Sequence, residues 1–191
     1  MKKRYKTDYF AKLCLLAKIC NDNISYTHKI ITSQQNTSEY TIHTGNDIMN
    51  EVKINLEKDY FAPFEREDIF LLCEKLNVLT KNSYFLCMNL SDNRFFGFPG
   101  NIISQIESLM KVSEAIHDIF IRLSKSQKKT DLNVHISKAE SKQEELIKRI
   151  YDSINKSQKA DYFSIIHLIE KCADSSKEII QLIQYTLLKN S

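Results

Sequence analysis

The sequence contains very little glycine and proline. Its 191 residues include three glycines and two prolines. An all-β sandwich needs turn residues between its many strands, so this scarcity argues against that fold class and is typical of long helices joined by few turns. A glycine-rich phosphate-binding loop is excluded for the same reason, because such a loop uses several glycines within a few residues.

Several other chemical signatures are also missing. The chain has no nucleophile elbow, no H-E-x-x-H pair and no zinc-type array of cysteine and histidine. Its cysteines are odd in number and none forms a C-x-x-C pair, and most lie in apolar helical stretches, where a free cysteine behaves as a small hydrophobic side chain. This pattern predicts a reducing compartment. The five are Cys14, Cys20, Cys73, Cys87 and Cys172.

The charges are mixed and nearly balanced. The chain carries 27 Lys and Arg against 24 Asp and Glu, a net charge of +3. Basic residues cluster only in the short stretches 1–6 and 125–129, so we expect no nucleic-acid partner. Asp8, Lys12 and Lys18 interrupt the segment after the basic start, and no apolar run reaches the roughly 20 residues that cross a bilayer. These features predict a soluble, cytoplasmic protein.

Apolar residues recur at steps of three and four along most of the chain, which is the period of amphipathic helices. The second helix is expected to pass through Gly45, the third to carry Phe85 on its apolar face, and the last to be capped by Asp161. No segment shows the alternation of a strand. The pattern predicts six helices, over residues 7–32, 37–59, 66–90, 102–124, 132–154 and 161–188.

One break divides these helices into two groups of three. Residues 93–99 hold one glycine, one proline and three phenylalanines, and Gly100 follows at once. Glycine and proline mark a turn, and the phenylalanines are expected to pack back on the helices. We therefore predict an all-α fold of six long helices in one domain, 1–191, whose repeated halves, about 1–92 and 100–191, are three-helix units packed side by side.

A sharp corner is expected between the second and third helices. Pro63 cannot donate a backbone hydrogen bond and disfavours helical geometry in the residue before it, so the preceding helix must stop near Asp59. The acidic residues after it favour the start of a new helix, because they face the positive end of its dipole. Phe61 and Phe64 flank the proline and can pack between the two helices. From the residues alone this is a helix-hairpin corner.

The corner also carries a resemblance to a known family. It reads A-P-F-E-R-E-D-I at 62–69, and the last helix reads E-K-C-A-D at 170–174 and ends in L-K-N at 188–190. These segments resemble the PhoU-like proteins of the Pit-accessory type, which carry a similar T-P-F-(D/E)-R-E-D-I corner and a last helix with an acid, a base, a cysteine and two further acids. The six-helix plan and the length agree too, so the resemblance covers essentially the whole chain.

The resemblance implies a metal-binding pattern in each half. The family carries paired E/D-x-x-x-D motifs on the second and third helices of each half, and carboxylates at i and i+4 lie on one helix face, where two such pairs can bind a hard cation. Carried over to this chain, the C-terminal half keeps Glu140 and Glu144 on one helix and Glu170 and Asp174 on the next, and His167 could add a nitrogen ligand.

The N-terminal half has lost the pattern. The matching positions hold Ile42 and Asn46, then Asn77 and Lys81, none of which is a carboxylate. The resemblance therefore implies at most one metal site, for a divalent or iron-type ion, in the C-terminal half. The alternative reading of the C-terminal carboxylates is a solvated helix face neutralised by nearby lysines.

The function that the resemblance implies is a non-enzymatic regulator or accessory protein of inorganic phosphate transport. It would act by protein–protein contact with a Pit-type transporter or another regulatory protein, and would approach a membrane only through that transporter; homo-oligomerisation stays open. One alternative is a helical interaction module with no phosphate role, which the degenerate N-terminal motifs favour over an enzyme. The other is a metal-dependent phosphohydrolase that uses the C-terminal carboxylates.

Overall fold

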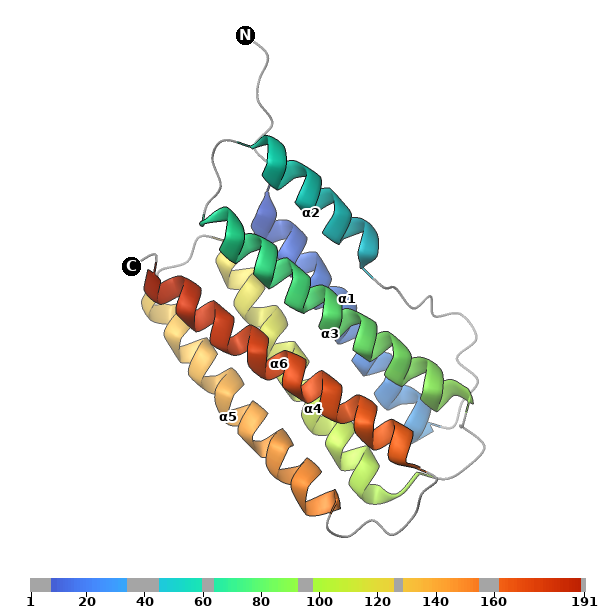
Figure 1. The fold of residues 1–191 in the computed structure, drawn as a ribbon. Coiled ribbons are helices and arrows are strands. Elements are labelled where there is room, and N and C mark those ends of the chain that lie inside the picture. Colours follow the sequence, from blue (N-terminus) through green and yellow to red (C-terminus); the bar gives the residue numbers. More distant parts are fainter. Residues whose placement is uncertain are drawn as a thin grey trace.

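The protein is an all-α bundle of long helices (Figure 1). The computed structural model describes residues 8–33, 45–59, 64–92, 98–125, 129–154 and 162–189, and no strand occurs among them. The predicted fold class is confirmed. The helices are α1 (Tyr9–Ser33), α2 (Asn46–Lys58), α3 (Arg66–Asp92), α4 (Gly100–Ser124), α5 (Lys129–Ile154) and α6 (Phe163–Lys189).

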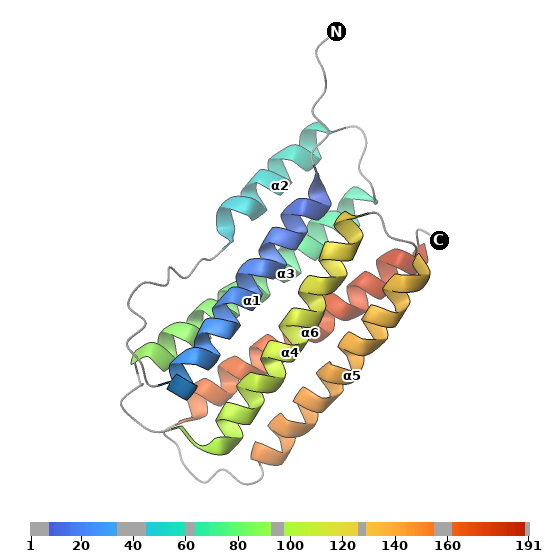
Figure 2. The ribbon, with the colours of Figure 1, turned by 180° about the vertical axis from the view of Figure 1, so that it is seen from behind.

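Four of the helices form the centre of the molecule. In Figures 1 and 2, α1 lies beside α3 and α4, and α6 lies beside α3 and α4. The shorter α2 lies against α3 and α1 at one side, and α5 lies against α4 and α6 at the other. None of the described helices is long and apolar enough to cross a membrane.

Polar contacts between helices show how α3 and α6 run relative to each other. The Lys75 ammonium lies 2.7 Å from the Glu178 carboxylate, while Asn82 Nδ2 donates to Ser175 Oγ at 3.2 Å. Because the residue number rises along α3 as it falls along α6, these two helices are antiparallel.

The Ser113 hydroxyl donates to Asn21 Oδ1 at 2.8 Å and joins α4 to α1 across the predicted halves. The internal repeat itself stays a prediction.

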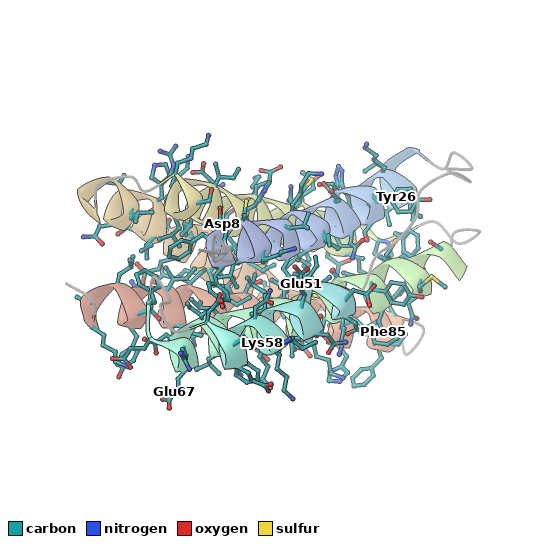
Figure 3. All side chains as sticks on the ribbon, turned by 90° about the horizontal axis from the view of Figure 1, so that it is seen from above. Asp8, Tyr26, Glu51, Lys58, Glu67 and Phe85 are labelled. Carbon is teal, nitrogen blue, oxygen red and sulfur yellow. The ribbon has the colours of Figure 1, made fainter. Side chains whose placement is uncertain are left out.

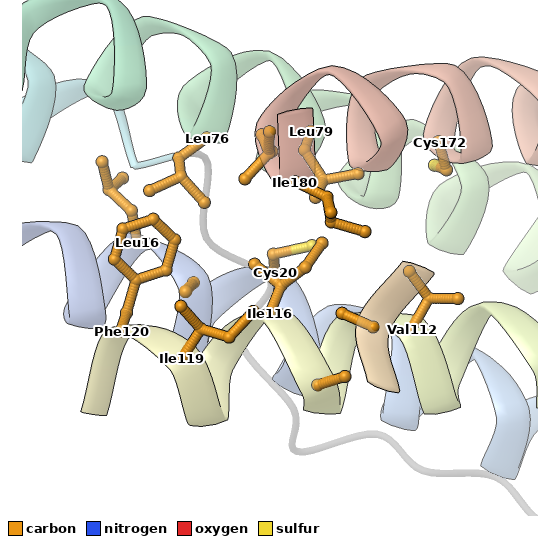
Figure 4. Close-up of a cluster of buried hydrophobic side chains, with 14 of the residues drawn as sticks. Leu16, Cys20, Leu76, Leu79, Val112, Ile116, Ile119, Phe120, Cys172 and Ile180 are labelled. Atoms are coloured by element: carbon orange, nitrogen blue, oxygen red, sulfur yellow. The ribbon is translucent and has the colours of Figure 1, made fainter. Parts of the chain in front are cut away.

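The hydrophobic core lies where α1, α3, α4 and α6 meet (Figure 4). Apolar residues three and four apart on each helix face inward there, which is what the sequence pattern predicts. One hydrophobic cluster contains residues from all six helices, so the two groups of three share a single core. Its central side chains include Leu16, Cys20, Leu76, Leu79, Ile116, Phe120 and Ile180.

The start of α2 differs from the prediction. Gly45 was expected inside a helix, but its backbone is left-handed, with φ +72°, and α2 begins only at the next residue. A Cβ built on Gly45 would lie 2.6 Å from Leu16 Cδ2, so the position suits glycine for both backbone and packing reasons. Sequence periodicity missed this because it registers side-chain spacing and not backbone handedness. The rest of the predicted N-terminal extension, 37–44, lies outside the described residues.

The predicted corner is confirmed at its two ends. α2 ends at Lys58 with Asp59 as its C-cap, and α3 begins at Arg66 with two acidic residues in its first turn. Phe64 packs edge-on against Phe10 of α1, with ring centroids 5.1 Å apart. Pro63 and Phe61 lie outside the described residues, as do residues 93–97 of the central break and the expected N-cap Asp161.

Ion pairs tie the corner and α2 to the rest of the bundle. Lys189, at the end of α6, pairs with Glu65 and lies 3.5 Å from the buried carboxylate of Asp68. On the other side of the corner, Glu51 points from α2 toward α1, where its carboxylate lies 2.7 Å from the Lys12 ammonium (Figure 3). The residues that follow the corner are therefore tied to the last helix, and α2 is tied to the first.

Candidate functional site

A cavity of about 230 Å³ lies between α5 and α6. Both Glu140 and Glu144 line it, so the structure places this predicted carboxylate pair on the side of α5 that faces α6. The lining combines acidic, basic, amide and apolar groups. It consists of Glu140, Gln143, Glu144, Ile147, Lys177, Ile180 and Gln181.

The two carboxylates of the cavity have different surroundings. Glu140 is half-buried, and its Oε1 accepts a hydrogen bond of 2.5 Å from Gln184 Nε2 of α6. Glu144 is exposed. Lys177 lines the same cavity, so its lining includes two acidic residues and one basic residue.

Gln143 is the feature of this cavity that sequence reasoning missed. It is 4% exposed, and its Nε2 donates to the Ala173 backbone oxygen at 2.7 Å. Its Oε1 is buried and has no hydrogen-bond partner among the described residues. The sequence did contain a sign of this residue. Ala139, Leu146 and Ile150 follow the three- and four-residue spacing of the buried face of α5, and Gln143 is the polar residue at the position between them.

The α6 members of the predicted site lie outside the cavity lining. His167 is exposed, with Nδ1 3.6 Å from Glu170 Oε2, and its ring stacks on Phe163 with centroids 6.4 Å apart. Asp174 is exposed on the same helix. Cys172, within the tail motif, is buried in the core, and burial raises the pKa of its thiol well above the usual value.

The fit of these residues to a metal ion can be judged from their arrangement. Among the side chains that the structure describes, no three His, Cys, Asp or Glu gather closely enough to hold a metal. Glu140 is engaged by Gln184, and the same lining includes the basic residue Lys177. The described residues as arranged do not bring together the ligands of a metal ion. The metal site of the C-terminal half is still a prediction, which metal analysis of the purified protein would test.

The N-terminal counterpart of the site is an amide pair. Asn77 Nδ2 lies 3.5 Å from Asn46 Oδ1, so the two positions matched by the resemblance do meet, between α2 and α3. Neither amide carries a charge, and Lys81 stands one turn further along α3. The matched position Ile42 lies outside the described residues.

A second feature is an apolar stripe on the outer face of α3, formed by Leu71, Val78, Phe85 and Met88. All four side chains are exposed, and Phe85 is 54% exposed. Phe85 was expected on the core face, and this expectation was wrong because Leu86 and Cys87 occupy the buried positions of that turn. Leu71, Val78 and Phe85 are seven residues apart, a spacing that returns to nearly the same helix face.

Comparison with known proteins identifies the type of fold. No protein-family model matches the chain, and no curated protein matches it in sequence. Two crystal structures match it over 95% of its length and 99% of theirs. One is a protein from Shewanella oneidensis MR-1 that is described as a PhoU-like phosphate regulatory protein, with 13% identity and a TM-score of 0.60. The other is a PhoU-like protein from the same organism, with 12% identity and a TM-score of 0.62. At such identity the likeness establishes a PhoU-like helical fold, as the sequence resemblance implied.

Proposed function

We propose that this protein is a cytoplasmic, non-enzymatic regulator or accessory protein of inorganic phosphate transport. It acts by docking a helix face on a Pit-type phosphate transporter or on another regulatory protein. The observation that carries this proposal is the likeness of fold, over almost the whole chain, to a protein described as a phosphate regulator. The corner motif and tail of the sequence support it independently of the fold.

The α3 stripe is the surface that best supports docking. Phe85 and its neighbours expose apolar area on one helix face, and exposed apolar patches of this kind are typical of protein contact sites. Aromatic side chains contribute most to such contacts, because they bury a large area at little cost in side-chain entropy. We therefore assign Phe85 to the centre of the contact.

Direct binding tests the proposal. The purified chain is titrated against a Pit-type transporter of the same organism, held in lipid nanodiscs, by biolayer interferometry. We expect saturable binding, and Phe85→Asp should weaken it by at least about tenfold, because it places a charge in the apolar contact. Val134→Asp is the matched control. Val134 is 68% exposed on α5, which makes no contact with α3 among the described residues.

A failure of binding would favour the second candidate, a helical interaction module with no phosphate role. The neutral amide pair Asn46–Asn77, at positions where the resemblance implies carboxylates, is the observation that favours this alternative. Saturable binding that Phe85→Asp and Val134→Asp weaken equally would support the transporter as partner but refute the α3 stripe as the docking face.

A further inference from the structure

The α3 stripe has a regular spacing, and two opposite charges stand beside it. Leu71, Val78 and Phe85 are exposed and recur every seven residues, so they follow one another along one helix face over about 21 Å. Glu74 and Lys81 are also seven residues apart. Each stands three residues after a member of the stripe, and this spacing places it beside the stripe on the helix surface.

These two charges have no ion-pair partner among the described residues. Glu74 is exposed and Lys81 is half-buried, and neither pairs with a side chain of another helix that the structure describes. The neighbouring Lys75, by contrast, pairs with Glu178 of α6 at 2.7 Å. Within one copy, Glu74 and Lys81 are about 10 Å apart along the helix axis, which is too far for an ion pair.

A two-fold axis at Val78 would match this helix face to a second copy of itself. If two α3 helices pack antiparallel across that axis, Leu71 lies opposite Phe85 of the second copy. The same axis brings Glu74 level with Lys81 of the second copy to within about 0.8 Å along the helix. Antiparallel pairing places the same flank of both helices on the same side, so the two opposite charges meet twice. In a parallel pair they would stay about 10 Å apart along the axis.

We propose that the α3 stripe binds a second copy of this chain, in an antiparallel dimer with two-fold symmetry. The apolar residues and both charges find their complements on the second copy, as an isologous interface requires. The contact is limited to one helix face, and interfaces of such small area are weak and transient. The dimer therefore covers the stripe reversibly, and its dissociation exposes the surface that the proposed function assigns to the transporter.

Sedimentation equilibrium of the purified full chain tests the dimer, from about 5 to about 500 μM in low-salt buffer. We expect the average mass to rise toward twice that of the chain as the concentration increases. Glu74→Lys and Lys81→Glu should each weaken the dimer by about tenfold or more, because each replaces two attractions across the axis by two repulsions. Glu114→Lys is the matched control, since Glu114 is exposed on α4, which makes no contact with α3 among the described residues.

A mixture of the two single variants gives the sharpest test. A Glu74→Lys chain paired with a Lys81→Glu chain regains both attractions across the axis. The equimolar mixture should therefore dimerise about as strongly as the wild type, although neither variant does so alone. The double variant Glu74→Lys/Lys81→Glu should behave in the same way, and this recovery would also show that the single substitutions leave the fold intact.

The proposal is overturned if the wild-type chain stays monomeric at the highest concentration, if Glu114→Lys weakens the dimer as much as Glu74→Lys, or if the mixture fails to recover. The dimer itself does not depend on a phosphate role, and only its competition with the transporter for the stripe rests on the proposed function. A monomeric chain that binds the transporter would overturn the dimer alone. A dimer that forms as described while no transporter binds would contradict the proposed function alone.

Discussion

Replacing Gly45 by alanine tests whether Gly45 lies inside a helix or in a left-handed turn before α2. The two conformations predict changes of opposite sign in the free energy of unfolding. Inside a helix, as the sequence pattern predicted, alanine would stabilise the protein by about 1 kcal/mol relative to glycine. In the structure, Gly45 has φ +72°, where a residue with a Cβ costs about 1–2 kcal/mol. The new Cβ would also lie 2.6 Å from Cδ2 of the fully buried Leu16, and forcing extra atoms into a packed core costs about 1–3 kcal/mol. We expect Gly45→Ala to lower the free energy of unfolding by about 2–5 kcal/mol.

Urea unfolding followed by far-ultraviolet circular dichroism measures this change. Gly100→Ala is the control, because Gly100 opens α4 and a Cβ there meets nothing within 4 Å. That variant should change the free energy of unfolding by less than about 0.5 kcal/mol. A Gly45→Ala protein as stable as the wild type, or more stable, would refute both the left-handed conformation and the close approach to Leu16.

The remaining predictions concern the thiols, the corner and the metal. Burial raises the pKa of Cys20 and of Cys73 to about 12, whereas the thiols of the unfolded chain ionise near pH 9. Between these values the unfolded state loses protons that the folded state keeps. The free energy of unfolding should therefore fall as the pH rises above about 9. In the native protein near pH 8, Ellman's reagent should label Cys14 well before the four buried thiols, and equal labelling of all five would contradict the burial. Lys189→Met should lower the stability measured in urea, because it leaves the buried Asp68 carboxylate without its cation. The double variant that also carries Asp68→Asn should recover part of this loss. If the effects of the two substitutions are additive, the two residues do not interact. Elemental analysis of protein purified without a histidine tag should find no stoichiometric metal, because the predicted ligands do not converge. One equivalent of iron, zinc or manganese that is lost in a Glu140→Gln/Glu170→Gln variant would contradict this expectation and support the predicted metal site.

The helices themselves could be predicted from the sequence. The three- and four-residue spacing placed α3, α4 and α6 within a few residues of their observed bounds, because amphipathic helices leave this period in the sequence. The spacing identifies a buried face but not the helix that covers it. The close packing of α1 on α4, supported by the Asn21–Ser113 hydrogen bond, therefore had to come from the structure. Phe85 shows the same limit, since one apolar residue beside Leu86 can fall on either face.

The candidate site could be predicted only in part. Glu140 and Glu144 share a helix face, as their spacing requires, and they line one cavity. Spacing alone could not place them relative to Glu170 and Asp174, because that depends on the rotation of α6 about its axis. Nor could it show that the Gln143 amide is anchored by the Ala173 carbonyl, a contact between residues 30 positions apart.

The rate of phosphate uptake by cells tests the central proposal most directly. Initial uptake of ³²P-labelled phosphate is compared between wild-type cells, cells that lack this protein, and cells that express it again as the wild type or as Phe85→Asp, at equal levels of the transporter. We predict that loss of the protein changes the uptake rate, that the wild-type chain restores it, and that Phe85→Asp fails to do so although the protein accumulates normally. An uptake rate that is the same in all four strains would contradict a role in phosphate transport.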